Sequence, residues 1–466
     1  MIRRTKIVAT LGPATARPEQ IGALLDAGAN VLRVNASHGT AELRAQWIAA
    51  ARQQADKRDL PIAVLVDLQG PRIRVGELKR PRVLEPGQTV VLAPEDSAKG
   101  EQLPTTYDAL ATDAKVGAKI LLNDGLLSLE VTKVTPPTVE TRVLVGGELT
   151  SHKGMNLPGL TVSAPALTPK DREDVAAAVQ HGADYLALSF VRRAEDLETL
   201  RALVPKTMKL VAKIEKSAAL DDLERILNTT DAVMVARGDL GVELPFETVP
   251  LVQKRLIREA NRHGKPVITA TQMLESMVHN PRPTRAEASD VANAILDGTD
   301  AVMLSAETAM GEYPVEAVAA MDRIIREMER QNPSRDERRR AEHRQGVAVE
   351  DAIAMGTTAV ARMLETPLIV CMTQSGFTAR KVAAFRPPVP ILAVTTVPLT
   401  YRQLALVWGT VPDLVDRVPG YDVMLEVVRD LILKSDYAKP GDRIVVTAGV
   451  PWGVSGSTNL IKVEEV

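Results

Sequence analysis

The chain has little of several residue classes that carry specialised functions. It contains one cysteine in 466 residues, so no intramolecular disulfide can form, and a reducing compartment is the better expectation. Aromatic residues make up 3%, which is too few for platforms that stack single-stranded nucleic acid. The formal net charge of −2 gives no general attraction to nucleic acid or to an anionic membrane. These shortages argue against both kinds of partner.

Long hydrophobic segments are also missing. No run of about 18 apolar residues occurs, so no transmembrane helix is expected. Residues Met1–Arg4 lead directly into the apolar stretch Thr5–Leu11, without the hydrophobic core and small-residue cleavage site of a signal peptide. We therefore expect a cytoplasmic protein. The single cysteine, Cys371, lies in the apolar run Leu368–Met372 and is expected to be a buried core thiol rather than a nucleophile.

What the chain does have is a repeated alternation of short apolar runs and helical stretches. The apolar runs are Thr5–Leu11, Asn30–Asn35, Ile62–Leu68, Tyr185–Phe190, Leu210–Glu215, Ala232–Ala236, Pro266–Ala270 and Ala301–Ser305. Eight strands with helices between them are the rhythm of a closed parallel (β/α)₈ barrel, an α/β fold. A doubly wound sheet gives a similar rhythm. The count of eight, and the polar residues that end nearly every strand, favour the TIM barrel.

The alternation is interrupted once and resumes near the C-terminus. Residues 70–163 lose helical periodicity and show β-rich runs with turn signals such as Asn123-Asp124-Gly125, which predicts an inserted all-β domain. Since it follows a barrel strand, it would lie over the mouth as a lid. The charged run Arg335–Arg344 is interpreted as a linker. The predicted domains are a barrel at 1–69 and 164–335, a lid at 70–163, and a C-terminal α/β open-sheet domain at 345–466, with strands at Pro367–Thr373, Pro390–Thr396, Asp442–Ala448 and Leu460–Val466.

Polar residues gather where the barrel strands end. Lys213 and Glu215 stand at i and i+2, so their side chains share a strand face, and Arg237 and Asp239 would do the same if their strand runs that far. In this fold, catalytic groups come from the C-terminal ends of several strands. We therefore predict an active site at the mouth, built from Arg33, Asn35, Ser37, Asp67, Ser189, Lys213, Glu215, Arg237, Asp239, Thr271, Ser305 and Glu307.

The residue types at the mouth suit phosphoryl chemistry. Glu215 and Asp239 offer oxygen ligands to a hard cation such as Mg²⁺, which one or two carboxylates and substrate oxygens commonly hold. The alternative is that they only form salt bridges with Lys213 and Arg237. Lys213 would neutralise charge on a transferring group or form a Schiff base. Residues Gly238–Gly241 would open a short helix whose free N–H groups favour an anion.

A second polar cluster surrounds the end of the second strand. Arg33 is a natural phosphate ligand because its planar fork matches phosphate oxygens. The cluster of Arg33, Asn35, Ser37 and Asp67 offers several oxygens and could hold a monovalent cation. His38 lies beside it, and a solvent-facing or ligand-edge position is as reasonable for this histidine as a catalytic one.

A third candidate site lies in the C-terminal domain. Residues Thr373–Thr378 connect a strand to a helix, and hydroxyl groups with a glycine at a helix N-terminus form a phosphate cradle. The loop Gly453–Asn459 could close over it, although two ordinary tight turns are the alternative. The predicted effector residues are Thr373, Ser375, Gly376, Thr378, Gly453, Gly456 and Ser457.

Several of these motifs, in order along the chain, resemble those of the pyruvate kinase family. They are Thr5–Pro13, Arg33–Gly39, Lys153–Gly159, Lys213–Glu215, Met234–Gly241, Thr269–Met277, Pro283–Glu287 and Asp290–Thr308. The resemblance covers nearly the whole chain. It implies a glycolytic phosphotransferase that moves the phosphoryl group of phosphoenolpyruvate to ADP, giving pyruvate and ATP. It also implies an allosterically regulated homotetramer with barrel, lid and effector domains.

The resemblance further implies a role for each matching residue. Lys213 would stabilise the transferring phosphoryl charge, Arg33 would contact phosphate, and Glu215 and Asp239 would hold Mg²⁺ or Mn²⁺. Ala236, Gly238 and Thr271 would line the substrate pocket together with Arg33, Lys213 and Asp239. Thr271 and Ser305 are the candidates for delivering the proton to enolpyruvate. Asn35, His38, Arg74 and Lys170 would contact the nucleotide.

The chain also departs from the family pattern. Potassium-dependent members typically carry threonine, lysine and glutamate where this chain has Leu68, Gln69 and Arg72. The pattern resembles the potassium-independent branch, in which lysine is usual where this chain has Arg72. A guanidinium at this position could take the place of K⁺ beside the cluster of Asn35, Ser37, Asp67 and Leu68. We therefore expect activity without K⁺. Ala218 and Ser163 replace acidic residues, and Phe377 is not usual in the effector loop, so the resemblance does not choose between a sugar phosphate and AMP as effector.

Two rival functions remain compatible with parts of the sequence. A metal-dependent barrel lyase or aldolase acting on pyruvate-like enolates would need neither nucleotide nor lid, and Arg74 and Lys170 at the lid hinges argue against it. A non-catalytic metabolite sensor would be expected to lose Lys213, Glu215 or Asp239, and all three are present.

Overall fold

The centre of the molecule is a closed barrel of eight parallel strands. The computed structural model describes residues 2–331, 348–416, 420–450 and 458–466. The strands pair in the order β1-β16-β15-β14-β13-β12-β3-β2. Their bounds are β1 (Lys6–Leu11), β2 (Val31–Asn35), β3 (Ala63–Asp67), β12 (Tyr185–Leu188), β13 (Lys209–Ile214), β14 (Ala232–Ala236), β15 (Val267–Ala270) and β16 (Ala301–Leu304). The predicted TIM barrel is therefore confirmed, and the doubly wound sheet is excluded.

Helices surround the barrel, and the strand sequences explain why both strand faces are covered. Alternate residues point inward, such as Val8, Val31 and Met234, or outward against the helices, such as Leu32 and Val233, and all are buried. The helices are α1 (Pro18–Asp26), α2 (Ala41–Asp56), α4 (Pro169–Gln180), α5 (Ala194–Arg201), α7 (Leu223–Thr229), α9 (Val249–Arg262), α10 (Arg285–Asp297) and α12 (Pro314–Gln331), with short α6 (Ala218–Asp221), α8 (Arg237–Glu243) and α11 (Ala306–Ala309).

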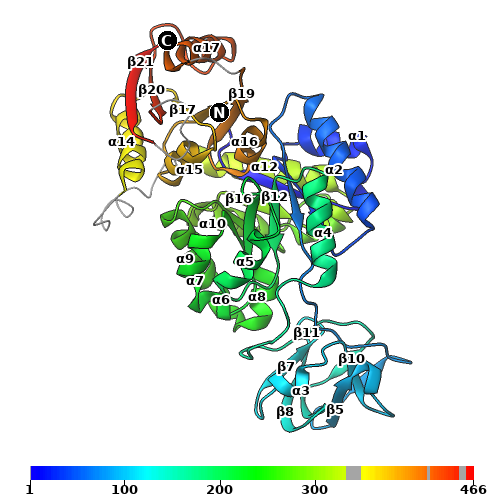
Figure 1. Ribbon diagram of the computed structural model, residues 1–466. Coiled ribbons are helices and arrows are strands. Elements are labelled where there is room, and N and C mark those ends of the chain that lie inside the picture. The colour runs from blue at the N-terminus through cyan, green and yellow to red at the C-terminus, as the bar shows by residue number, and fades with distance from the viewer. Residues whose placement is uncertain (1, 332–347, 417–419, 451–457) are drawn as a thin grey trace.

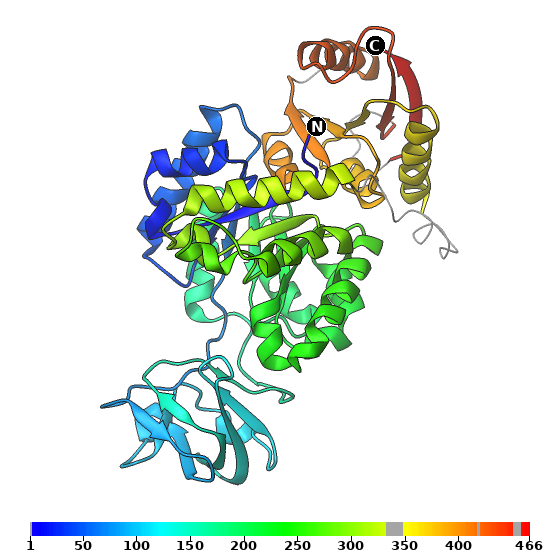
Figure 2. The same ribbon diagram turned by 180° about the vertical axis from the view of Figure 1, so that it is seen from behind.

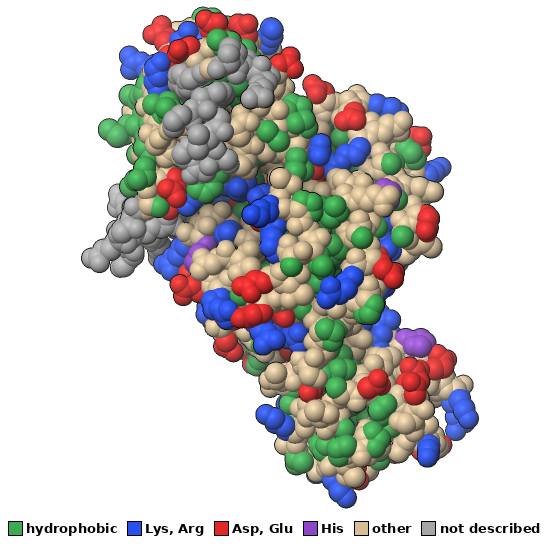
Figure 3. Space-filling model, in the orientation of Figure 1, with side chains coloured by type: hydrophobic (Ala, Val, Ile, Leu, Met, Phe, Trp, Pro, Cys, Tyr) green, Lys and Arg blue, Asp and Glu red, His purple; other side chains and the backbone are tan. Residues whose placement is uncertain are grey.

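The insertion after β3 is a separate β lobe. Its six-stranded sheet has the order β11-β7-β8-β9-β5-β6, and a two-stranded sheet pairs β10 with β4. The elements are β4 (Arg82–Leu84), β5 (Thr89–Pro94), β6 (Leu103–Thr105), α3 (Leu110–Asp113), β7 (Lys119–Leu122), β8 (Leu127–Thr135), β9 (Thr138–Val145), β10 (Gly147–Leu149) and β11 (Met155–Asn156). It has its own core, which includes Leu92, Ile120 and Leu129. Figure 1 shows this lobe at one end of the barrel, and Figure 3 shows it as a distinct projection.

The C-terminal domain lies at the other end of the barrel (Figures 1 and 2). Its five strands have the order β19-β18-β17-β20-β21, and β21 alone is antiparallel to its neighbour. The elements are α14 (Val349–Met363), β17 (Ile369–Met372), α15 (Phe377–Ala384), β18 (Ile391–Thr395), α16 (Pro398–Gln403), β19 (Thr410–Leu414), α17 (Tyr421–Lys434), β20 (Arg443–Ala448) and β21 (Leu460–Glu465). The sequence analysis missed β19, because Pro412 and Asp413 are typical of an edge rather than of a central strand.

The C-terminal domain closes the bottom of the barrel. Ala405 and Leu406 are fully or nearly fully buried in the same apolar cluster as the inward-facing strand residues Val8 and Met234. Cys371 is buried in β17 as predicted, and burial raises the pKa of its thiol. The charged run 335–344 lies outside the described residues. Among the helices that are described, none combines the length and apolarity needed to cross a membrane.

Candidate active site

A buried carboxylate, Asp67 at the end of β3, organises the centre of the mouth. The Arg33 guanidinium approaches it at 2.6 Å and 2.8 Å, and Lys213 Nζ lies 3.2 Å from its Oδ1. Burial alone would raise the pKa of Asp67, but Lys213 and Arg33 outweigh burial and lower it. Arg33 also donates to Thr10 Oγ1 (3.1 Å), so its fork is fixed from two strands. Asp67 therefore works as the anchor for two cations at the mouth.

Lys213 is held by three groups from three strand ends. Its ammonium donates to Ser189 Oγ (2.7 Å) and lies 2.8 Å from Glu215 Oε1, in addition to its contact with Asp67. The short distance to Glu215 confirms that positions 213 and 215 point the same way. Burial would lower the pKa of Lys213, but Asp67 and Glu215 outweigh it and raise the pKa. Lys213 is thus a fixed ammonium ion, and this state disfavours a Schiff-base role, which needs a neutral amine.

Glu215 and Asp239 are a pair of interacting carboxylates beside this lysine. Burial raises the pKa of Glu215 to about 6 against the lowering effect of Lys213, and the Asp239 carboxylate raises it further. Burial also raises the pKa of Asp239. The Phe190 N–H donates to Glu215 Oε2 (2.7 Å) and fixes its orientation. Two buried carboxylates that repel one another fit a divalent cation, whose charge would stabilise both.

The point at which β14 ends and α8 begins determines whether Arg237 points into the mouth together with Asp239. β14 ends at Ala236 and helix α8 begins at Arg237, so the prediction that Arg237 and Asp239 share a strand face is wrong. Arg237 turns away to Asp290 (2.7 Å) and to the Thr271 carbonyl (2.7 Å). A salt bridge between Arg237 and Asp239 is therefore excluded, whereas Glu215 does pair with Lys213. Asp239 is left in the first turn of a helix, as the predicted helix opening at Gly238–Gly241 requires.

The strand end at Thr271 is strained. Thr271 has φ +69° and Gln272 has φ +53°, a left-handed conformation that is uncommon for residues other than glycine and rarest for a β-branched one such as Thr271. The Gly238 N–H donates to Thr271 Oγ1 (2.8 Å), and that hydroxyl donates to the Ala270 carbonyl (2.6 Å). Strain of this kind concentrates at functional sites. It places the Thr271 hydroxyl directly beside the N-terminus of α8.

Ser305 lies at the end of β16, in a different polar cluster. Its N–H donates to Glu307 Oε2 (2.6 Å), and Glu307 Oε1 accepts from the Leu274 N–H (3.0 Å). Burial raises the pKa of Glu307. Glu307 therefore ties two neighbouring strand ends together.

A cavity of about 1280 Å³ lies between these strand ends and the lid. Its lining includes Arg33, Asn35, Ser37, Leu68, Gln69, Ser189, Phe190, Lys213, Glu215 and Asp239 from the barrel, and Arg72, Arg74, Asp124 and Lys153 from the lid and its hinge. The residues predicted at the mouth or for the substrate and nucleotide that are not part of this lining are His38, Asp67, Lys170, Ala236, Arg237, Gly238, Thr271, Ser305 and Glu307. Asp67 lies beneath it, with 1% of its side chain exposed.

Arg72 supplies a further cation to this cavity. Burial and Arg74 lower its pKa, while Asp239, Asp67 and Glu215 raise it. Within the part of the chain that the structure describes, its guanidinium makes no hydrogen bond and no ion pair. Arg72 therefore interacts electrostatically with the same three carboxylates as Lys213 does.

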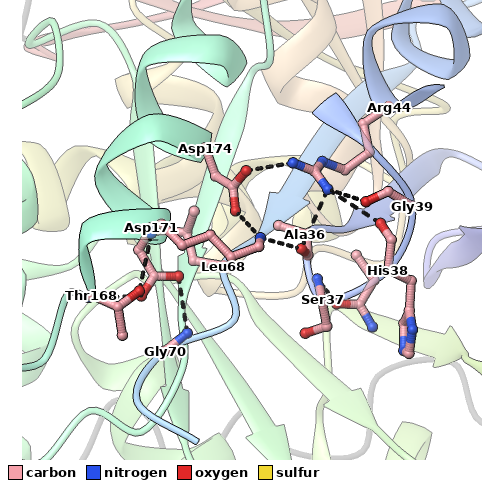
Figure 4. A network of polar contacts seen from close by, with 12 residues as sticks. Ala36, Ser37, His38, Gly39, Arg44, Leu68, Gly70, Thr168, Asp171 and Asp174 are labelled. Carbon is pink, nitrogen blue, oxygen red and sulfur yellow. Dashed lines mark hydrogen bonds and ion pairs between the residues drawn. The ribbon is translucent and has the colours of Figure 1, made fainter. Parts of the chain in front are cut away.

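The loop after β2 is held by a network around Asp174 (Figure 4). Arg44 donates to the carbonyls of Ala36 (3.4 Å), His38 (3.3 Å) and Gly39 (2.9 Å) and pairs with the Asp174 carboxylate. Lys170 donates to the same Ala36 carbonyl (2.8 Å) and to Asp174 (2.5 Å). The network fixes the backbone of the loop, and Lys170 is engaged in that network.

Asn35 and His38, two polar residues of this loop, lie in different surroundings. Asn35 Oδ1 accepts from the Ser37 N–H (3.0 Å), so Asn35 shapes its own loop. Burial lowers the pKa of His38, and the nearby Arg72, Arg33 and Arg74 lower it further. At neutral pH His38 is therefore a neutral imidazole, able to donate one hydrogen bond and to accept another.

The lid hinge is fastened to the start of α4. Asp171 caps this helix through Thr168 (2.9 Å and 3.1 Å), and its other oxygen accepts from the Gly70 N–H (3.1 Å) (Figure 4). Gly70 has φ +68°, and a side chain there would collide with Phe190. The lid hinge is therefore held in place close to Phe190, the residue whose N–H orients Glu215.

The C-terminal loop has the geometry of a helix N-terminus. Gly376 has φ +73° and precedes α15, and Thr378 Oγ1 lies 2.7 Å from Thr458 Oγ1. Thr400 donates to the Gln374 carbonyl (2.7 Å), which fixes the loop that contains Thr373 and Ser375. Of the predicted effector residues, Gly453, Gly456 and Ser457 lie outside the described residues.

Comparison with known proteins identifies the family. A model of the pyruvate kinase barrel domain matches residues 2–318, and a model of the pyruvate kinase alpha/beta domain matches residues 351–464. The chain belongs to the pyruvate kinase family. It is 46% identical to the pyruvate kinase of Geobacillus stearothermophilus over 474 residues, which cover 100% of this chain and 81% of that protein. It is 43% identical to the pyruvate kinase of Mycobacterium tuberculosis over 472 residues, which cover 100% and 99%.

A solved structure extends the pyruvate kinase match to the whole fold. The crystal structure of a pyruvate kinase from Cryptosporidium parvum superposes with a TM-score of 0.94 at 34% identity, covering 99% of this chain and 96% of that one. The predicted family, enzyme class and three-part fold are therefore confirmed.

The cavity lining of this pyruvate kinase family member includes charged residues that were not predicted, among them Lys216, Glu243 and Asp124. Lys216 Nζ lies 2.5 Å from Glu243 and 5.5 Å from the centre of the Phe190 ring, and Asp124 reaches the cavity from the lid. Glu243 stands four residues after Asp239 on α8, a spacing that would have placed both carboxylates on one helix face. In the sequence, Asp124 indicated only a turn, because its position at the cavity depends on how the lid packs against the barrel.

Proposed function

We propose that this enzyme transfers the phosphoryl group of phosphoenolpyruvate to ADP, giving pyruvate and ATP. The observation that carries the proposal is the position of Lys213, a buried ammonium fixed by Asp67, Ser189 and Glu215 on the wall of a large cavity. Phosphoryl transfer asks mainly for positioning and for neutralisation of spreading negative charge. A permanently charged, immobile lysine supplies both without reorganisation.

Arg33 and Lys213 act on the phosphoryl group from neighbouring positions. Asp67 holds both cations, so the distance between them is set before substrate arrives. Both residues line the same cavity. In this proposal Arg33 binds the phosphoryl oxygens in the ground state, and Lys213 stabilises the charge that develops on transfer.

Glu215 and Asp239 are the residues that would hold Mg²⁺, or Mn²⁺ in its place. The ion supplies charge neutralisation and a template for substrate oxygens when it is bound. The described residues contain no cluster of three or more histidine, cysteine, aspartate or glutamate side chains suited to a metal. Two carboxylates leave most of the coordination shell to substrate and water, which is the usual manner for Mg²⁺.

Ala236, Gly238 and Thr271, at the start of α8 next to the cavity residue Asp239, are proposed to contact the enolate part of the substrate. The Thr271 hydroxyl accepts from the Gly238 N–H, so protein fixes its oxygen beside the start of α8. We propose Thr271 ahead of Ser305 for proton delivery, because Ser305 belongs to the separate cluster around Glu307. A proton that Thr271 gives up would have to be replaced from water in the cavity.

The nucleotide is proposed to bind along the loop after β2 and the lid hinge. Asn35 and Arg74 line the cavity, and a neutral His38 can donate to a phosphate or sugar oxygen. Lys170 contributes by holding this loop through Ala36 and Asp174. The role of Lys170 is thus proposed to be positioning, in place of the direct contact that the resemblance implied.

Independence from K⁺ follows from the charge of Arg72. The cluster of Asn35, Ser37, Asp67 and Leu68 is the predicted monovalent-cation site, and its carboxylate, Asp67, is among the groups that raise the pKa of Arg72. We propose that Arg72 takes the place of the ion.

Several properties complete the proposal. The predicted domain limits are retained at 1–69 with 164–335, 70–163 and 345–466. A phosphorylated effector, a sugar phosphate or AMP, would bind at Thr373, Ser375, Gly376 and Thr378 with Gly453, Gly456 and Ser457, and regulate the enzyme allosterically. The enzyme would act as a cytoplasmic homotetramer.

One assay separates this function from its rivals. Purified protein is incubated with phosphoenolpyruvate and Mg²⁺, with and without ADP, and pyruvate and ATP are measured. We expect equal amounts of both products, formed only when ADP is present. Pyruvate formed without ADP, together with an equal amount of inorganic phosphate, would indicate hydrolysis in place of transfer. No pyruvate under either condition would support the lyase, aldolase or sensor alternatives.

A further inference from the structure

The two carboxylates at the mouth lie on different segments of the barrel. Glu215 follows the end of β13 directly, and Asp239 lies in the first turn of α8, at the end of the barrel that faces the lid (Figure 1). One ion can bind both carboxylates only if these two segments keep a fixed distance from one another. An ion pair between Lys216 and Glu243 joins the same two segments.

This ion pair lies close to both carboxylates along the chain. Lys216 is the residue after Glu215, and Glu243 is the last residue of α8, four positions after Asp239. Lys216 Nζ lies 2.5 Å from Glu243 Oε1, and the side chains are 19% and 3% exposed. Among the residues that the structure describes, the Glu243 carboxylate has no other hydrogen-bond or ion-pair partner. A carboxylate buried in this way is costly without its cation, so the link is a firm one.

Phe190 gives Lys216 a second contact. The Lys216 ammonium lies 5.5 Å from the centre of the Phe190 ring, within the range of a cation–π interaction. The N–H of the same Phe190 donates to Glu215 Oε2 (2.7 Å). Phe190 has φ +55°, a conformation that is uncommon for residues other than glycine. Lys216 therefore connects the residue that orients Glu215 with the helix that carries Asp239.

We propose that Lys216 is a positioning residue, whose contacts with Glu243 and Phe190 set the distance between Glu215 and Asp239. This inference rests on the proposed function, in which these two carboxylates hold the divalent ion. A lysine ammonium has no lone pair to offer, so Lys216 acts through its neighbours and is not itself a ligand. Removing a group that holds metal ligands in place typically lowers metal affinity by about 10–100-fold.

The test measures Mn²⁺ affinity by electron paramagnetic resonance, which reports the free ion, so it needs no turnover. The variant carries Lys216→Met together with Glu243→Gln. It leaves no buried charge unpaired and keeps the net charge, so a change in affinity reports position rather than charge. We expect Mn²⁺ to bind about tenfold more weakly than to the unmodified enzyme. Lys216→Arg, which keeps the cation for both contacts, should bind Mn²⁺ nearly as well as the unmodified enzyme.

The matched control removes a different ion pair of the barrel. Lys254 in α9 pairs with Asp297 at the end of α10, and neither residue lines the cavity. Lys254→Met with Asp297→Asn should leave Mn²⁺ affinity unchanged. Thermal unfolding of the metal-free proteins sets a temperature at which every variant is folded.

Two results would overturn the positioning role of Lys216. The first is Mn²⁺ affinity in the Lys216 and Glu243 double variant equal to or above that of the unmodified enzyme. The second is the same loss in the control double variant, which would indicate a general effect of losing an ion pair. Glu215→Gln separates this inference from the proposed function. If Glu215→Gln weakens Mn²⁺ binding and the double variant does not, only the positioning role is wrong; if Glu215→Gln has no effect, the metal site itself is wrong.

Discussion

The two ends of the barrel use the same residue types for different purposes. At the bottom, Asp184 is completely buried and is bonded to Arg52 (2.6 Å), Arg402 (2.9 Å) and the Val64 N–H (2.7 Å). Arg386 holds both oxygens of Asp300 (2.9 Å and 3.0 Å). The pairs of Arg402 with Asp184 and of Arg386 with Asp300 join the C-terminal domain to the barrel. At the mouth, Glu215 and Asp239 interact with one another across a cavity and carry raised pKa values.

The difference shows how function can be recognised from electrostatics within one fold. Charged groups at the bottom are satisfied by fixed partners, so they contribute to stability and to domain packing. Those at the mouth are left partly uncompensated, so a ligand with the right charges gains from binding there. This agrees with the general division of barrels into a catalytic and a stabilising face.

The largest expected effect comes from removing the charge of Lys213 at the mouth. Lys213→Met should lower kcat by on the order of 10³ or more, because a preorganised charge that stabilises the transition state is lost. The matched control is Lys209→Met, at the other end of the same strand, which should keep kcat close to that of the unmodified enzyme. Steady-state kinetics measures both. Near-normal turnover in Lys213→Met would refute the role assigned to it.

At the bottom of the barrel, a substitution is expected to lower the stability of the protein rather than kcat. Arg386→Met leaves Asp300 buried without its partner, and breaking a buried pair in this way costs about 3–5 kcal/mol. The stability of the variant is measured by thermal unfolding, and its kcat at a temperature where it stays folded. If Arg386→Met lost kcat strongly without losing stability, the proposed division between a catalytic mouth and a stabilising bottom would be wrong.

The raised pKa of Glu215 predicts a pH dependence confined to the mouth. A metal ion must displace the proton that Glu215 holds below about pH 6, so Mn²⁺ affinity should fall about tenfold per pH unit below that value. In the metal-free protein, the stability that protonated Glu215 contributes is present at low pH and is lost as the pH rises through about 6. Mn²⁺ titrations followed by electron paramagnetic resonance test the first statement. An affinity that stays constant from pH 7 to 5 would contradict it.

The smallest expected effect concerns K⁺. Adding K⁺ to the unmodified enzyme should leave kcat unchanged, because Arg72 already supplies the positive charge at the cluster. Arg72→Met should be less active and should respond to K⁺, whereas Arg192→Met, at another wall of the cavity, should not gain such a response. Strong stimulation of the unmodified enzyme by K⁺ would refute the proposal that the Arg72 guanidinium takes the place of the ion.

The sequence predicted the structure best where a local pattern of residues determines the outcome. Eight apolar runs predicted eight barrel strands, and the i, i+2 spacing of Lys213 and Glu215 predicted their contact. It was least informative where a long-range contact decides the outcome. Arg237 follows an apolar strand just as Lys213 ends one, yet Asp290, fifty-three positions away, draws it out of the mouth. The pairing of Arg44 with Asp174, 130 positions apart, left no local signal at all.

The account depends on Glu215 and Asp239 sharing one divalent ion next to Lys213. The most direct test is a crystal of the enzyme soaked in Mn²⁺, with the ion located by its anomalous scattering. We predict one strong peak bonded to an oxygen of each carboxylate, at about 2.0–2.2 Å. The peak should vanish in Glu215→Gln crystals. A peak elsewhere in the molecule, or one unaffected by that substitution, would contradict the account.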